Sequence, residues 1–134
     1  MSRTIYQATL LNQTALTGTP ARKWLFNGDN TGAPQFFAVD LRDASSASIF
    51  ISTVGGVTGT VCTFETSTDP NGLIGYGAAA YRLPGGGAYA ATALTVGPGV
   101  ARSVFLDPTD NICWIRLNVT TNDGTPLVVL TFED

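Results

Sequence analysis

The 134-residue sequence contains no histidine and a single lysine, Lys23, and only 13% of its residues are charged. The absence of histidine removes the commonest general base, the usual serine and cysteine catalytic triads and the commonest zinc ligand. The cationic side chains are scattered, and only Arg22 and Lys23 are adjacent, so the clustered positive charge that binds nucleic acid is missing. No apolar run approaches the roughly 18 residues of a membrane-spanning helix. We therefore expect neither a nucleic-acid partner nor a membrane partner.

The N-terminal segment lacks a basic stretch followed by a long apolar core, which predicts a protein that is made in the cytoplasm and not secreted. The sequence has only two cysteines, Cys62 and Cys113, and strand alternation places each on an apolar face. We interpret them as buried thiols, with a disulfide as the alternative. The low charge also indicates an exterior that is partly covered by partners or that carries short polar side chains.

The most informative stretch spans residues 57–72, VTGTVCTFETSTDPNG. Residues 57–65 are rich in Val, Thr and Phe, which is typical of a strand, and alternation places Thr60, Cys62 and Phe64 on one face. Residues 66–72 carry turn chemistry, because Pro presets one backbone angle and Gly tolerates a positive φ. A strand that ends in such a turn predicts a sheet.

The same pattern recurs along the chain. The glycine pair at residues 55–56 and the Asn-Asp-Gly sequence at residues 122–124 are each predicted to form a hairpin turn. The expected strands are 4–11, 35–41, 47–54, 57–65, 100–106, 111–120 and 126–132, with weaker candidates in 73–83 and 88–96. The sequence therefore predicts an all-β fold, a two-sheet antiparallel β-sandwich of jelly-roll or immunoglobulin-like topology with roughly seven to nine strands. We expect residues 1–134 to form one domain, with residues 1–34 as a partly irregular N-terminal arm.

Candidate chemical sites are few. The cluster of Asp107, Asp110 and Asn111 has the oxygen ligands that Ca²⁺ accepts, but it lacks the spacing of a calcium loop, and turn chemistry is the favoured interpretation. Asp40 and Asp43 flank Arg42 at a strand end, which is typical of a solvated edge. No pair of carboxylates is placed across a cleft, so we expect no enzyme, no metal and no cofactor.

One loop segment carries residue types that are enriched at protein interfaces. Arg22, Lys23, Trp24 and Phe26 form a short basic and aromatic patch, which predicts a protein-interaction site. The alternative is that Trp24 and Phe26 cap one end of the sandwich.

Two stretches carry a resemblance to a known group of proteins. Residues 47–72, with the strands ASIFISTV and VTGTVCTFE and the turn TSTDPNG, resemble the small β-sandwich structural proteins of tailed bacteriophage particles. Residues 111–132, NICWIRLNVTTNDGTPLVVLTF, are similar to the closing strand pair of those proteins. The resemblance implies a virion component, either a capsid decoration (cement) protein or a tail or baseplate accessory domain. It also implies the major capsid protein or other virion proteins as partners. Symmetry favours a homo-oligomer, such as a trimer at a local threefold axis.

A carbohydrate-binding module for receptor recognition is the alternative function. Such a module would stack exposed aromatic side chains on sugar rings, and the candidates are Trp114, Tyr76, Tyr81 and Tyr89. An enzyme is a third class and would require two convergent carboxylates in a cleft.

Overall fold

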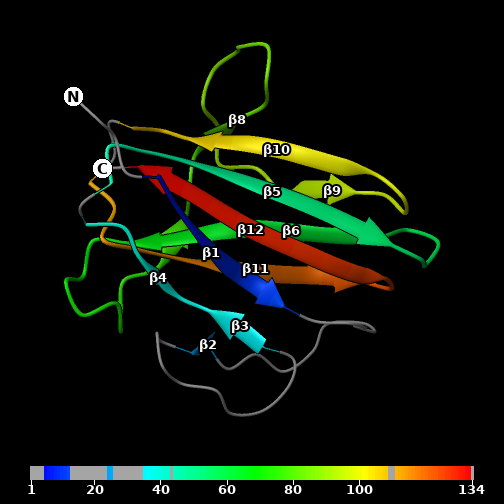
Figure 1. Cartoon of the computed structure of the whole chain (residues 1–134), viewed down its shortest axis with the longest axis horizontal. Coiled ribbons are helices and arrows are strands. Elements are labelled where there is room, and N and C mark those ends of the chain that lie inside the picture. The colour runs from blue at the N-terminus through cyan, green and yellow to red at the C-terminus, as the bar shows by residue number, and fades with distance from the viewer. Residues whose placement is uncertain (1–4, 13–23, 26–34, 43, 109–110, 134) are drawn as a thin grey trace.

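The computed structural model describes residues 5–12, 24–25, 35–42, 44–108 and 111–133, and within these ranges the secondary structure consists of strands alone (Figure 1). The predicted all-β, two-sheet sandwich is confirmed. Those described ranges contain twelve strands where roughly seven to nine were predicted, because several connections contain pieces of two or three residues that pair with a sheet. The strands are β1 (Ile5–Asn12), β2 (Trp24–Leu25), β3 (Gln35–Phe37), β4 (Val39–Asp40), β5 (Ser46–Val54), β6 (Thr60–Ser67), β7 (Gly77–Ala78), β8 (Tyr81–Arg82), β9 (Leu94–Val96), β10 (Ala101–Leu106), β11 (Trp114–Asn122) and β12 (Thr125–Glu133).

The strands form two layers. The first sheet has the order β2-β3-β1-β12-β5-β10-β8, and the second has the order β4-β11-β6-β7, with β9 also paired with β6. All of these pairings are antiparallel except that of β2 with β3. Each sheet contains a path of four strands, β1-β12-β5-β10 in the first and β4-β11-β6-β9 in the second. If these eight strands are numbered 1 to 8 in chain order, the two paths become 1-8-3-6 and 2-7-4-5. This order is that of a jelly roll, which decides between the two predicted topologies.

The core lies between the sheets and follows the predicted alternation. On β6, Thr60, Cys62 and Phe64 are buried, and on β11 Ile115, Leu117 and Val119 are buried. The first sheet contributes buried side chains at alternate positions, among them Ile49, Ile51, Val104, Val128 and Leu130. Each long strand thus gives one face to the core and one to the exterior.

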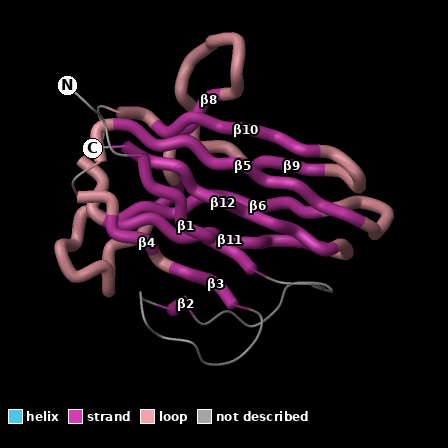
Figure 2. The backbone as a smooth tube through the Cα atoms, viewed as in Figure 1, coloured by secondary structure: helices cyan, strands magenta, loops and turns pink. Residues whose placement is uncertain are grey.

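Two predicted hairpins are wrong. Residues 55–59 connect β5 with β6, and residues 123–124 connect β11 with β12, yet the two strands on either side of each connection belong to different sheets. β5 pairs with β12 and β10, whereas β6 pairs with β11. Each tight turn therefore carries the chain over the end of the sandwich, as Figure 2 shows.

Two strands depart from simple alternation. The predicted strand 35–41 breaks at Ala38, so that β3 joins the first sheet and β4 joins the second. In β1 the register to β12 shifts between Thr9 and Leu11, and this bulge buries both Leu10 and Leu11. At the beginning of the same strand, Tyr6 is 44% exposed, and its ring stacks on that of Phe132 with the ring centroids 5.2 Å apart.

The two cysteines are free thiols. Cys62 is buried opposite Val119, and burial raises the pKa of its thiol to about 12. Cys113 is partly buried, and its backbone N–H donates to Ser67, which lies five residues along β6 from Cys62. That spacing corresponds to roughly 17 Å along a strand, too far for a disulfide.

The proposed N-terminal arm is described only at residues 5–12 and 24–25, where β1 and β2 belong to the first sheet. The remainder of residues 1–34 lies outside the described part of the chain. The assignment of an arm therefore stays a prediction.

Candidate functional site

The exterior of the first sheet carries exposed apolar side chains, and we call this surface the outer apolar face. Four of them are large, namely Ile5 (66% exposed), Phe50 (43%), Val54 (68%) and Leu127 (43%). They come from β1, β5 and β12, which lie side by side in the sheet, and all four occupy positions that alternate with the core residues. The half-buried Val129 lies opposite Phe50 on the neighbouring strand.

The outer apolar face carries little charge. Its other outward positions are mostly small and polar, such as Ser48, Ser52, Ser103 and Thr131. On the described outward positions of β1, β12, β5 and β10, Glu133 at one end is the single charged residue, and its Oε1 accepts a hydrogen bond from Ser46 Oγ at 2.9 Å. Burying such a face against a partner would cost little desolvation of charge.

Sequence reasoning did not identify this face, although a signal was present. The run at residues 47–54 is nearly continuous in apolar residues, which predicts a strand with both faces partly covered. The structure gives the inward side to Ile49 and Ile51 and leaves Phe50 and Val54 open to solvent. The extra apolar side chains therefore mark an exterior surface.

The exterior of the second sheet holds a polar and aromatic cluster. Arg116 Nε donates to Glu65 Oε1 at 3.0 Å across the strand pair, and the guanidinium carbon lies 3.7 Å from the centroid of the Tyr76 ring. The Tyr76 hydroxyl donates to the carbonyl of Gly72 at 2.8 Å, and burial raises the pKa of Tyr76. Arg116 thus covers one face of the Tyr76 ring and makes that face inaccessible to a sugar.

Trp114 packs on the turn that follows β6. Its Nε1 donates to the Pro70 carbonyl at 3.0 Å, and its ring lies directly over Gly72. A Cβ built on Gly72 would lie 2.6 Å from Trp114 Cγ, and Gly72 has a φ of +68°, so both the space and the backbone angle require glycine.

The four aromatic residues of the carbohydrate hypothesis do not form a common exposed platform. Tyr81 is only 6% exposed and packs edge to face on Phe64 at 5.8 Å, which removes it from the surface. Tyr76 and Trp114 are engaged as described above, and Tyr89 lies in the separate connection between β8 and β9.

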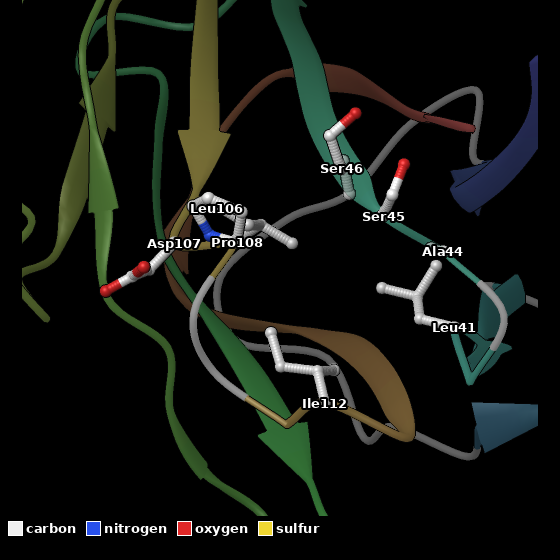
Figure 3. Close-up of a pocket in the computed structure, with 9 residues that line it drawn as sticks. Leu41, Ala44, Ser45, Ser46, Leu106, Asp107, Pro108 and Ile112 are labelled. Atoms are coloured by element: carbon white, nitrogen blue, oxygen red, sulfur yellow. The ribbon is translucent and has the colours of Figure 1, made fainter. Parts of the chain in front are cut away.

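A small cleft lies between the layers at one end of the sandwich (Figure 3). Leu41, Ala44, Leu106 and Ile112 line it, and its volume of about 40 Å³ suits water and not a substrate. Figure 3 shows the Asp107 carboxylate directed away from Leu41 and Ala44.

The sequence-predicted polar candidates have separate outcomes. Asp40 forms an ion pair with Arg42, and this hydrogen bond lowers the pKa of Asp40, as expected for a solvated edge. Asp43 and Asp110 lie outside the described residues. Across the described ranges, no group of three or more Cys, Asp or Glu side chains is placed to hold a metal ion.

Of the predicted interaction residues, Arg22, Lys23 and Phe26 also lie outside the described part of the chain. Trp24 is described as part of the backbone of β2, which pairs with β3. Their role in protein interaction stays a prediction.

Comparisons with known proteins give the fold. No protein-family model matches the chain, and no curated protein sequence matches it. Among solved structures, the chain is similar to the SPBc2 prophage-derived protein YomS, with a TM-score of 0.62 and 9% sequence identity. The match covers 100% of this chain and 96% of that chain. In the described ranges, no helix is long and apolar enough to cross a membrane.

Proposed function

We propose that this chain is a structural component of a tailed-phage particle, specifically a capsid decoration (cement) protein that binds and stabilises the shell. Two independent features support a phage origin. The strand and turn motifs of residues 47–72 and 111–132 resemble phage structural proteins, and the fold is similar over 96% of a prophage-derived protein. The proposed role needs no catalytic group.

The observation that carries the proposal is the outer apolar face. Phe50, Val54 and Leu127 are exposed on the outer surface of β5 and β12, and the described outward positions of β1, β12, β5 and β10 carry a single charge, Glu133, at one end. Isolated apolar side chains on a surface are ordinary, but a contiguous group on neighbouring strands is typical of a protein interface. We propose that an equally uncharged surface of the major capsid protein covers this face.

The mechanism would be mechanical. A sandwich held by a continuous core would bridge neighbouring capsid subunits, and repetition over many equivalent positions would convert weak contacts into a stable coat. Closed symmetry favours a homo-oligomer, for example a trimer on a local threefold axis of the shell.

The test is co-sedimentation of the purified chain with capsids of the same phage that were assembled without it. We expect binding at a fixed ratio to the capsid protein. The double variant Phe50→Ser and Leu127→Ser adds no charge to the face but removes its two central large apolar side chains. Each truncation should weaken a contact by about 1 kcal/mol, because each side chain is already half buried in the free protein.

Leu73→Ser is the matched control, since Leu73 is 66% exposed but lies in the connection after β6 in the second sheet. This variant should bind capsids like the natural chain. Equal loss of binding in the control, or full binding by the double variant, would refute the assignment of the face. A chain that ignores capsids altogether would refute the proposed function.

A further inference from the structure

β10 is an edge strand over most of its length. It pairs with β5 along residues 101–105, but on its other side β8 pairs only with Phe105 and Leu106. In the described part of the chain, no strand lies beside residues 101–104 on that side. Figure 1 shows this free edge at the end of β10 away from its arrowhead. The four residues of the free edge span about 13 Å.

The hydrogen bonds between β10 and β5 indicate which backbone groups face the free edge. The N–H of Thr53 donates to the carbonyl of Val100 at 3.3 Å, so residue 100 is hydrogen-bonded to β5. Because this bonding alternates along an antiparallel pair, the backbone groups of Arg102 are directed to β5, and those of Ala101 and Ser103 are directed to the free edge. The N–H and C=O groups of these two residues are therefore open to a further strand.

The chain itself turns away from this edge at Pro84. β8 runs antiparallel to β10, and a straight continuation of β8 would place residues 83–86 beside residues 101–104. Proline has no N–H to donate to a neighbouring strand, so it interrupts such a pairing. The connection from β8 to β9 projects beyond the sheet instead, as Figures 1 and 2 show. The place beside the free edge is therefore left to another strand.

A hollow lies next to the free edge, between β10, β9 and the connection from β8 to β9. Its volume is about 510 Å³. The connection contributes mostly small residues to the wall, among them Gly86, Ala88, Ala90 and Ala93. The hollow therefore has room for the inward side chains of a strand that is added to β10.

Arg102 supplies a charge at this edge. It shares the inward side of β10 with the buried Val104 and Leu106, but it is exposed and lines the hollow. No carboxylate belongs to the lining, and within the described ranges no ion pair involves Arg102. Inward-pointing charges protect the edge strands of natural proteins against unspecific pairing. Arg102 thus disfavours an uncharged strand and leaves a cation for an acidic one.

We propose that the free edge of β10 accepts an extended acidic segment of another protein, which adds a strand to the first sheet. In such strand addition, backbone hydrogen bonds supply affinity and alternate side chains supply specificity. The added strand bonds to Ala101 and Ser103 through its backbone and places an Asp or Glu opposite Arg102. Cross-strand side chains come closest at that position, because the backbone of Arg102 bonds to β5 and not to the added strand.

A second copy of this chain fits the edge poorly. A twofold pairing of two β10 edges that uses both Ala101 and Ser103 of each copy places the two Arg102 side chains opposite each other. Like charges directly opposite each other destabilise a sheet. The site is also separate from the outer apolar face, and its proposed role does not depend on the capsid role.

The first measurement is amide hydrogen exchange of the isotope-labelled full chain, followed by NMR. The amides of Ala101 and Ser103 should exchange fast, because no strand covers them, and those of Arg102 and Val104 should exchange slowly. Slow exchange at Ala101 and Ser103 would show that the edge is already covered, and it would overturn the proposal.

The second measurement is an NMR titration at low salt with the capped peptide acetyl-Val-Thr-Glu-Thr-Val-amide. Its central Glu can face Arg102 while the neighbouring Thr residues face outward. We expect the amide signals of Ala101 and Ser103 to shift and their exchange to slow. The same peptide with Lys in place of Glu is the control, and it should bind roughly fivefold more weakly or not at all.

Three variants test the residues of the edge. Arg102→Glu should reverse the preference, so that the Lys peptide binds more tightly than the Glu peptide. Ser103→Pro removes an N–H that faces the free edge and not β5, so the chain should fold but lose peptide binding. Arg42→Gln removes a charge far from the site and should bind like the natural chain. Circular dichroism checks that Ser103→Pro folds, and Arg102→Glu decides the test if it does not.

The outcomes separate strand addition from its alternatives. Binding of the Glu peptide at β10, with a preference that reverses in Arg102→Glu, supports the proposal. Equal binding of the two peptides, or signal shifts away from β10, overturns it. A dimer in sedimentation equilibrium that Ser103→Pro abolishes would show that a second copy occupies the edge, and it would overturn the proposal as well.

Discussion

Asp123 and Gly59 bind each other in both directions. Asp123 Oδ1 accepts the backbone N–H of Gly59 at 2.8 Å, and the Gly59 carbonyl accepts the backbone N–H of Asp123 at 3.1 Å. Oδ2 of the same carboxylate accepts the N–H groups of Val57 and Thr58. One side chain thus ties together the two turns that carry the chain between the sheets at this end.

This arrangement predicts a pH-dependent stability. The backbone N–H groups of Val57, Thr58 and Gly59 lower the pKa of Asp123 from 3.8 to about 2. Because the folded pKa is below the unfolded value, the stabilisation is present above about pH 4 and is lost as the pH falls towards 2. Asp123→Asn cannot titrate and loses the Oδ2 acceptor, so its melting temperature should be lower at neutral pH.

The measurement is the melting temperature of both proteins from pH 7 to pH 2. The difference in melting temperature should narrow below pH 4, because Asp123 becomes protonated and loses its charge. Other carboxylates, such as Asp69 and Asp40, titrate in both proteins and so do not change this difference. A gap that stays constant with pH would contradict the proposed role of the charge.

Gly72 predicts a second stability effect. Gly72→Ala places a Cβ against the Trp114 ring and forces alanine into a left-handed backbone, which should cost about 1–3 kcal/mol from the backbone alone. Gly85→Ala is the control, because Gly85 also has a positive φ but no atom within 4 Å of the new Cβ. Urea denaturation should show a larger loss for Gly72→Ala, and equal losses would show that the Trp114 contact is unimportant.

The core predicts a strong contrast within one residue type. Phe64 is fully buried between the sheets and packs on Tyr81, so Phe64→Ala should lower the free energy of unfolding by about 3–5 kcal/mol. Phe50→Ala on the outer apolar face should cost under about 1 kcal/mol in the free protein. Guanidinium denaturation of both variants checks this, and similar losses would mean that Phe50 is buried in solution, for example in a homo-oligomer.

The two thiols should react differently with Ellman's reagent. Cys113 is partly accessible, whereas Cys62 is buried and its thiol pKa is raised to about 12, so little thiolate forms in the native state. We expect one thiol to react in the native protein at pH 8 and the second only in denaturant. The variant Cys113→Ala should remove the native reaction, and a rapid reaction that persists in it would contradict the burial of Cys62.

Local chemistry predicted which side of a strand is buried but not which strand is its neighbour. The alternation at Thr60, Cys62 and Phe64 depends only on the two-residue period of a strand, and the structure confirms it. The turns at residues 55–56 and 123–124 look the same whether the chain folds back into one sheet or crosses to the other. The partner of each strand is set by packing between distant segments, which a single turn does not encode.

The candidate sites could not be predicted from the sequence for the same reason. Arg116 and Glu65 are far apart in the sequence, and only the fold shows that they form an ion pair across neighbouring strands. The bulge that buries both Leu10 and Leu11 also has no local mark, because either leucine could continue a regular strand. By contrast, the apolar character of Phe50 and Val54 is visible in the sequence, where the run at residues 47–54 predicts partial cover on both faces of the strand.

The pairing of Ile5 with Glu133 has a mechanical consequence. β1 and β12 run antiparallel from this pair to Asn12 and Leu127, so the beginning of one strand lies beside the end of the other. Pulling Ile5 and Glu133 apart would load the hydrogen bonds between the strands one after another, whereas pulling Ile5 against Leu127 would load them together in shear. In single-molecule force measurements we expect the first attachment to rupture at lower force. A domain that is held through its sheet surface would therefore resist a tension that separates β1 from β12 when the same domain is pulled by Ile5 and Glu133.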